Sequence, residues 1–453
     1  MKDISLLVPS DLLIDDSWYG VYFAGKYIGY SHSFMKVKEE DLGGYIINND
    51  TILDIPILGS VEKISLRSEI NLNKSYSLES ASMRLNSSNY FLKGYLNYKE
   101  KNKFYLSLVS STQRIDKIVE LSEKIIGSTF NPMIFNYLPV KKNISFSVFD
   151  PLSEKKLLVN IINKGGTKLF IDGKYYSAIE FILDVEGVKG KIYTDNKGRL
   201  LKQEFLGFQL IREEPKNIFK KNISTLPLDL IERFSIPSVI IPNKEELNYF
   251  KVRIIGLEKK FITHSANQMV LEDGKTLEIH KKLPKRIISL PIEENNFKDY
   301  LEEDNFIKFK GTQIEIIAKE IVGKENNAFN IVKLFLEWLD KNIEKVPTFS
   351  LPNPLDVLKL RRGDCGELSA LLVGFLRSVG IPSYVNIGVV YYEGRFFYHA
   401  WVSAFVGEWI DVDPALNQVI ADPTHIVLFK GLDGQFELFK IIDKLQIEVL
   451  EYR

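Results

Sequence analysis

The chain has 453 residues, 45% of them hydrophobic and 12% aromatic, which is enough to form substantial buried cores in about two to four folding units. Lysine and arginine together number 59, as do aspartate and glutamate, so the formal net charge is zero and nucleic acid is excluded as an expected partner. The single cysteine excludes an internal disulfide and a cysteine-rich zinc site, but it leaves a role as nucleophile open.

The N-terminal residues offer no targeting or membrane segment. Only a short apolar run, residues 4–8, precedes Pro9, and it is too short for a signal-peptide core or a membrane span. We therefore expect a cytoplasmic protein without a membrane span. That expectation changes to an extracytoplasmic one if a natural leader has been replaced at Met1.

Residues 1–215 have the pattern of an antiparallel β domain. Short alternating segments run from Trp18 to about Arg212, separated by turn formers such as Asp172-Gly173 and residues 195–198. Residues 216–305 differ, because prolines at 227, 237 and 242 predict a connector without regular structure of its own. Strand-like runs within 248–292 then predict a small β module that can hardly form an independent core.

Residues 306–453 combine helices with strands, which makes the whole chain α+β. The segments IEIIAKEIV and NIVKLFLEWLDKNI carry apolar residues at helical spacing. In the second of them, one stripe is formed by Phe329, Val332, Phe335, Leu336 and Leu339. We expect both segments to be core helices.

The only cysteine, Cys365, lies at the predicted start of a third helix. Asp364 and Glu367 have the spacing of a capping box. Apolar residues at three- and four-residue intervals follow until glycine and proline end the helix: Leu368, Leu371, Leu372, Phe375, Leu376, Val379, Gly380 and Pro382. The helix start favours a thiolate, an effect that Arg361 and Arg362 add to and the two acids oppose. A buried cysteine acting as a small apolar residue is an equal alternative on position alone.

A histidine and a carboxylate follow on predicted antiparallel strands. Alternation places His399 and Trp401 on one face of the strand FFYHAWVSAF, and it places Asp411 and Asp413 on one face of the next strand. Cys365, His399 and an aspartate would then supply a nucleophile, a base and a group that orients the base. Alternation does not choose between the two aspartates, and His399 taken alone would more readily be a core histidine.

These residues resemble the core of the transglutaminase-like superfamily. The matching motifs, in chain order, are Gly363-Asp364-Cys365, Gly380-Ile381-Pro382, His399-Ala400-Trp401 and Asp413-Pro414. The resemblance covers roughly residues 311–440, and the β-rich region more weakly resembles the N-terminal extension of uncharacterised bacterial members. It implies a papain-like α+β domain over 306–453, with Cys365 as nucleophile, His399 as general base and acid, and Asp413 as orienting carboxylate. Leu368 stands where some relatives have a second histidine, so no role transfers to that position.

The resemblance predicts a hydrolase or acyltransferase that acts on the amide bonds of a protein or peptide through an acyl-enzyme. The alternative is a catalytically idle transglutaminase-like module used for binding. We expect Trp401, Tyr398 and Glu367 to line the substrate groove, although aromatic residues beside a strand histidine more often serve packing. The Cys365 N–H is the expected oxyanion donor, without an identified second donor.

No cofactor or metal is expected. The histidines at 32, 264 and 280 lie in β segments without a nearby second ligand, and no phosphate-binding loop motif occurs. His425, close to Asp422, is the one competitor for the role of base, and we expect it at the surface or at a loop end. The sequence does not predict the oligomeric state.

Overall fold

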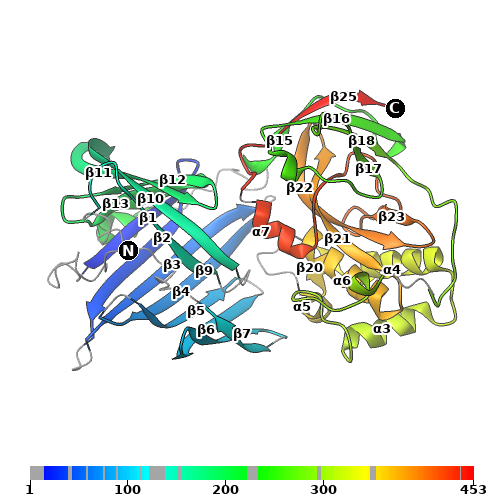
Figure 1. The fold of residues 1–453 in the computed structure, drawn as a ribbon, viewed down its shortest axis with the longest axis horizontal. Helices are drawn as coiled ribbons and strands as arrows, with labels where there is room; N and C mark the ends of the chain where they lie inside the picture. Colours follow the sequence, from blue (N-terminus) through cyan, green and yellow to red (C-terminus); the bar gives the residue numbers. More distant parts are fainter. Residues whose placement is uncertain are drawn as a thin grey trace. The chain divides into compact units, whose positions relative to one another are not determined.

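We describe the chain from a computed structural model. It describes residues 15–38, 43–57, 60–74, 77–87, 90–112, 114–121, 138–150, 155–221, 233–292, 297–346, 353–438 and 440–453. The chain divides into two compact units, Met1–Pro227 and Leu228–Arg453, and each is described by itself (Figure 1).

The first unit is built on one antiparallel sheet. Among the described residues this sheet has 14 strands in the order β8-β7-β6-β5-β4-β3-β2-β1-β14-β13-β12-β11-β10-β9. The strands are β1 (Asp15–Phe23), β2 (Lys26–Val37), β3 (Tyr45–Ile57), β4 (Ser60–Leu72), β5 (Leu78–Asn86), β6 (Phe91–Glu100), β7 (Lys103–Ser110), β8 (Arg114–Glu120), β9 (Asn143–Asp150), β10 (Lys155–Ile171), β11 (Lys174–Val185), β12 (Val188–Thr194), β13 (Leu200–Phe205) and β14 (Phe208–Arg212). A short helix, α1 (Pro215–Ile218), follows the last strand. Sequential strands are antiparallel neighbours from β1 to β8 and from β9 to β14, and β1 pairs with β14 in register Tyr19 to Arg212.

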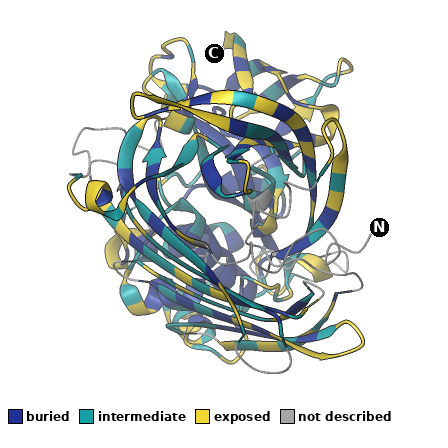
Figure 2. Ribbon diagram, turned by 90° about the vertical axis from the view of Figure 1, so that its left-hand side faces the viewer, coloured by how far each residue is buried: buried dark blue, intermediate teal, exposed yellow. Residues whose placement is uncertain are grey.

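Alternation along these strands creates the core of the first unit. In β12, the residues at 188, 190, 192 and 194 are buried and those at 189 and 191 are exposed, as a sheet with one covered face requires. One core cluster joins buried side chains of β1 with those of β9 to β13, among them Tyr19, Phe146, Ile161, Phe181 and Ile192. Figure 2 shows the sheet curving strongly, with buried and exposed residues alternating along its strands.

The second unit places helices against a mixed set of strands. The helices are α3 (Gln313–Val322), α4 (Ala328–Asn342), α5 (Pro354–Leu360), α6 (Cys365–Ser378) and α7 (Gln435–Leu438), with short 3-10 turns at Lys244–Glu246, Lys259–Phe261, Lys298–Tyr300 and Leu432–Gly434. The strands are β15 (Ile236–Pro237), β16 (Tyr249–Ile255), β17 (Gln268–Val270), β18 (Thr276–His280), β19 (Glu344–Lys345), β20 (Arg362–Gly363), β21 (Ser383–Tyr392), β22 (Arg395–Phe405), β23 (Trp409–Val412), β24 (Ile426–Lys430) and β25 (Gln446–Tyr452).

Helix α6 is the buried centre of this unit. It is covered on nearly all sides, and its apolar side chains form one core with α3, α4 and the strands β21 and β22. Asp364 and Glu367 form the predicted capping box, with Asp364 Oδ1 accepting from the N–H groups of Gly366 and Glu367 at 2.9 and 3.2 Å. The cap fixes where the helix begins, and it leaves Cys365 as the first helical residue.

The strands beside α6 form the expected antiparallel meander. β22 pairs with β21 along its length and with β23 at its C-terminal end, and β24 adds to the other edge of β21. The register sets Gly388 opposite His399 and Asp411 opposite Ser403. This sheet carries the candidate histidine and brings the end of β23 beside it.

The second unit includes the residues that we expected to form a separate middle domain. A four-stranded sheet has the order β17-β18-β16-β25, so its last strand comes from the C-terminus of the chain. Its core residues Phe250, Val252 and Leu277 pack with Val389 and Phe396 of the meander. Residues 233–292 therefore share their core with the C-terminal domain. The first compact unit ends at Pro227 and the second begins at Leu228, whereas the sequence analysis predicted boundaries near residues 215 and 305.

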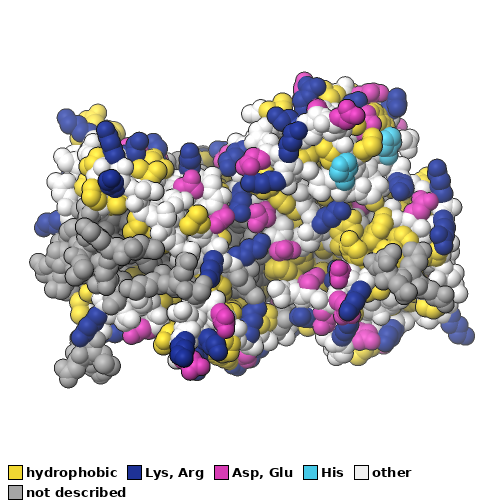
Figure 3. All heavy atoms as spheres, in the orientation of Figure 1, with side chains coloured by type: hydrophobic (Ala, Val, Ile, Leu, Met, Phe, Trp, Pro, Cys, Tyr) yellow, Lys and Arg dark blue, Asp and Glu magenta, His cyan; other side chains and the backbone are white. Residues whose placement is uncertain are grey.

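Within the part of the chain that the structure describes, no helix is both long and apolar enough to cross a membrane. On the face shown in Figure 3, positive and negative side chains are interspersed over both units. This mixture matches the zero net charge of the sequence.

Candidate active site

Cys365 and His399 meet between α6 and β22. The cysteine is partly exposed, and the His399 side chain is 10% exposed. Burial, the largest influence, lowers the pKa of His399. The charge of Asp413 and the charge and hydrogen bond of Cys365 outweigh it, so this pKa lies well above its usual value. The histidine is therefore stabilised as an imidazolium beside a thiol that can become its counter-ion.

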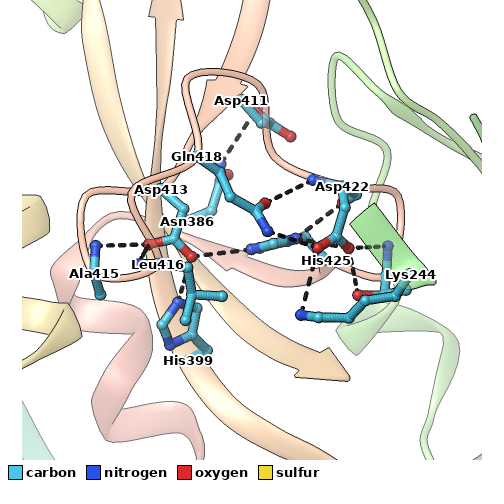
Figure 4. A network of polar contacts seen from close by, with 11 residues as sticks. Lys244, Asn386, His399, Asp411, Asp413, Ala415, Leu416, Gln418, Asp422 and His425 are labelled. Carbon is cyan, nitrogen blue, oxygen red and sulfur yellow. Dashed lines mark hydrogen bonds and ion pairs between the residues drawn. The ribbon is translucent and has the colours of Figure 1, made fainter. Parts of the chain in front are cut away.

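Asp413 holds the far side of the same imidazole. Its Oδ2 lies 2.7 Å from His399 Nε2, which leaves the Nδ1 edge of the ring for Cys365. Oδ1 accepts from the backbone N–H groups of Ala415 and Leu416, at 2.8 and 2.9 Å (Figure 4). Asp413 is completely buried, which alone would raise its pKa, but the histidine contacts lower it strongly. The carboxylate is thus held ionised and in one orientation.

Asp411, the other candidate carboxylate, faces different partners. Ser403 Oγ donates to its Oδ1 at 2.5 Å, and Asn386 Nδ2 lies 3.5 Å from the same oxygen. Burial raises its pKa, while the Ser403 hydrogen bond acts in the opposite direction. The structure therefore gives the contact with His399 to Asp413.

The main-chain donors at the start of α6 are almost all occupied by the cap. Asp364 N–H donates to Glu367 Oε2 at 3.1 Å, and Gly366 and Glu367 donate to Asp364. Among the described residues, no hydrogen bond engages the N–H of Cys365. One main-chain donor beside the sulfur is thus left available at the positive end of the helix.

The arginine pair before the cysteine contacts other groups. The Arg361 guanidinium lies over the Trp338 ring, 5.2 Å from its centroid, and Arg362 Nη2 lies 3.4 Å from Glu344 Oε2. These contacts direct both arginines to neighbours other than the thiol. The helix start and His399 therefore act on Cys365 with a positive field, which Asp364 and Glu367 of the capping box oppose.

The three expected groove residues occupy other environments. Trp401 is fully buried and lies behind His399, with ring centroids 6.3 Å apart and planes 16° apart. Tyr398 packs against the core that β16 and β18 share with the meander, and strand alternation turns it away from His399. Glu367 is buried in the capping box. These three side chains therefore serve packing and capping.

His425 joins the candidate site through contacts that the sequence analysis did not predict. It lies at a loop end, directly before β24, as we expected, but it is not at the surface, since it is only 3% exposed. Its Nε2 lies 3.0 Å from Asp413 Oδ2, and its Nδ1 lies 2.9 Å from the backbone oxygen of Asp422. The spacing of Asp422 and His425 was visible in the sequence, but nothing in it indicated a partner twelve residues upstream.

Asp422 extends the network away from the cysteine. Its Oδ1 accepts from Thr424, and its Oδ2 accepts from Gln418 Nε2 at 2.8 Å and lies 3.4 Å from Lys244 Nζ. Burial is the largest influence on its pKa and raises it, but the contacts with His425 and Lys244 hold it well below its usual range. Figure 4 shows this chain of contacts passing from His399 through Asp413 and His425 to Asp422.

The ligand atoms of His399, Asp413 and His425 lie within 4.8 Å of one another, a spacing that a three-ligand metal site also has. The contacts of 2.7 and 3.0 Å to one carboxylate oxygen are those of charge-assisted hydrogen bonds. Hydrogen bonds thus account for the arrangement.

Residues 315–414 match the family model described as the transglutaminase-like superfamily. An uncharacterised protein of Mycobacterium leprae (strain TN) is 28% identical over 134 residues, which are 27% of this chain and 47% of that protein. The chain thus spans about half the length of this curated relative.

Two solved structures show distant likeness. A candidate cysteine protease from Cytophaga hutchinsonii is 14% identical, with a TM-score of 0.32, over 46% of this chain and 86% of that one. A candidate protease from Parabacteroides distasonis is 12% identical, with a TM-score of 0.22, over 82% of this chain and 70% of that one. Residues 315–414 thus resemble the transglutaminase-like superfamily, and a β-rich region precedes them.

Proposed function

We propose that the C-terminal domain is a thiol enzyme that acts on amide or peptide bonds through an acyl-enzyme on Cys365. The observation that carries the proposal is the double engagement of His399, which interacts with Cys365 and lies 2.7 Å from Asp413 Oδ2. A base held between a nucleophile and an orienting carboxylate is the arrangement that acyl transfer requires. The resemblance of residues 315–414 to the transglutaminase-like superfamily supports the same chemistry.

In the first half-reaction, the Cys365 thiol gives its proton to His399, and the sulfur attacks the amide carbonyl carbon. The tetrahedral intermediate collapses when the carbon–nitrogen bond breaks, and the His399 imidazolium protonates the departing amine. A thioester remains on Cys365. Asp413 keeps the imidazole oriented and stabilises its positive charge throughout.

In the second half-reaction, His399 takes a proton from water or from an amine, which attacks the thioester carbonyl. The sulfur then leaves as a thiolate paired with the imidazolium, and the enzyme returns to its starting state. Both acceptors use the same groups, so the proposal covers hydrolysis and amine transfer alike. We propose a protein or peptide as the substrate.

The Cys365 N–H supports the proposal as a donor to the oxyanion of the intermediate. The neighbouring N–H groups serve the capping box, whereas this one has no partner among the described residues. A donor at a helix start also receives the positive end of the helix dipole. Removal of one such donor in other enzymes costs about 2.7–4 kcal/mol in the activation barrier.

Because Cys365 is the only cysteine, alkylation by iodoacetamide reports on this thiol alone. An ordinary thiol, with a pKa of about 8.5, reacts very slowly near pH 6. We expect the native protein to be alkylated there at least about ten-fold faster than the denatured chain, because His399 stabilises the thiolate.

Two variants sharpen this experiment. His399→Ala should return the reaction to the alkaline range of a free thiol, and His280→Gln, on an exposed strand position, should leave the rate unchanged. A native thiol with the same pH dependence in wild type and His399→Ala would contradict the proposal. Mass spectrometry for a thioester adduct on wild type, with Cys365→Ala as the blank, would then identify the acyl donor.

A further inference from the structure

The hydrogen bonds of His425 define its charge. Its Nδ1 faces the backbone carbonyl of Asp422, and its Nε2 faces the carboxylate of Asp413, at 2.9 and 3.0 Å. A carbonyl oxygen and an ionised carboxylate only accept hydrogen bonds, so both ring nitrogens must donate. His425 is therefore an imidazolium, although its side chain is only 2% exposed.

Asp413 is saturated by four donors. Oδ1 accepts from Ala415 and Leu416, and Oδ2 accepts from His399 and His425. A carboxylate has about four lone-pair positions, so no acceptor capacity remains. The same oxygen serves both histidines, and its negative charge is divided between them.

We propose that His425 is a positioning residue that fixes Asp413 Oδ2 and weakens the hold of this carboxylate on the His399 proton. The inference rests on the proposed function of Cys365, His399 and Asp413 and adds a fourth member to that set. A positive charge behind the carboxylate makes His399 a better proton donor to a leaving amine. The ring centroids of the two histidines are 6.0 Å apart, close enough for this coupling.

The groups around His425 come from several elements. The charged or titratable neighbours are Asp413 after β23, Asp411 on β23, Asp422 in the following loop, His399 on β22 and, through Asp422, Lys244. Trp401 covers the ring with its centroid 5.1 Å away. Negative neighbours lie on both sides of the imidazolium, so its charge is compensated within the buried network.

The test is histidine NMR on the full chain with isotope-labelled histidine, since the protein has five histidines that single variants can assign. Ring nitrogen shifts should show His425 doubly protonated across about pH 6–8, where an ordinary histidine titrates. In His425→Gln, which keeps a donor towards Asp413 without the charge, the His399 midpoint should rise by about one to two pH units. That shift corresponds to removing one charge at this distance at an effective dielectric constant of about 20.

Each outcome decides the matter. A neutral His425 ring near pH 7, or a folded His425→Gln protein with an unmoved His399 midpoint, would overturn the inference. If His425→Gln does not fold, the wild-type spectrum still tests the protonation of His425. Ring shifts that change on adding a chelator would also overturn it, because a metal would then hold the three groups. Failure of the proposed catalysis is recognised separately, by an unreactive Cys365 alongside these histidine shifts.

Discussion

Burial of the His425 imidazolium predicts a specific loss of stability at alkaline pH. Burial is the largest influence on its pKa and lowers it, but hydrogen bonds and charges from Asp413 and Asp422 raise it to about 9. The unfolded chain has the ordinary value of about 6.5. Below pH 6.5 the residue is protonated in both states, so its contribution to the free energy of unfolding is fully present. As pH rises towards 9, only the folded state keeps the proton, and the contribution is lost.

The size of the loss follows from the difference in pKa. One pKa unit corresponds to about 1.4 kcal/mol, so a shift of this size contributes about 3 kcal/mol in all. Asp413 and Asp422 do not add to the change, since their lowered pKa values leave both carboxylates ionised, in either state, across this range. His399 does add to it, because its pKa is raised as well. The effect of His425 is therefore best isolated in a His399→Ala background.

The assay is urea denaturation at several pH values between about 6 and 9, with tryptophan fluorescence as the signal. Three of the four tryptophans, at 338, 401 and 409, belong to the second unit. In His399→Ala, the free energy of unfolding should fall as pH rises, because His425 is still present. In the double variant with His425→Gln this fall should disappear, so the two slopes should differ by up to about 1.4 kcal/mol per pH unit. Adding His280→Gln to His399→Ala instead should leave the pH dependence of the free energy of unfolding unchanged. A difference between the variants that is the same at every pH would refute the assignment of a buried cation.

Two further changes test the elements that hold the site. Asp364→Ala removes the cap of α6 and should lower the free energy of unfolding by about 1 kcal/mol. Asp364→Asn keeps a cap but removes a negative charge beside Cys365, so it should speed the alkylation of Cys365 near pH 6. Equal stability of the two variants, or an alkylation rate of Asp364→Asn no faster than that of wild type, would contradict this. Gly388→Ala would place a Cβ 2.0 Å from the carbonyl oxygen of Ile426, so the melting temperature should fall by an amount equivalent to about 1–3 kcal/mol. An unchanged melting temperature would show that β21 and β24 can separate freely.

Local patterns in the sequence predict the elements that carry the candidate residues. The capping-box spacing places Cys365 in the first turn of α6, because the cap is a contact between residues three apart. Strand-like runs likewise identify β22, which carries His399, and β23, which Asp413 follows, although both strands are buried on both faces near the site. The choice of Asp413 over Asp411 came only from the resemblance, because alternation put both on the same face of the predicted strand.

Contacts between distant segments lay beyond local patterns. β25 completes a sheet with β16, pairing residues such as Arg253 and Glu448 that are far apart along the chain. The same limit hid the role of His425, which depends on a loop that folds back after Asp413. That return is held by Gln418, whose amide contacts Asp422 while its backbone pairs with Asp413.

The charges of the buried network around Asp413 alternate in sign, which explains why these groups can be charged although they are buried. From the surface inwards, Lys244 is positive, Asp422 negative, His425 positive, Asp413 negative and His399 positive in its raised-pKa state. An isolated buried charge costs several kcal/mol, but each charge here has neighbours of opposite sign within hydrogen-bonding or ion-pair distance. Counted without Cys365, the chain of five groups carries one excess positive charge, at the end that faces the sulfur. This positive charge on His399 is the one that the proposed acyl transfer would place beside the Cys365 sulfur.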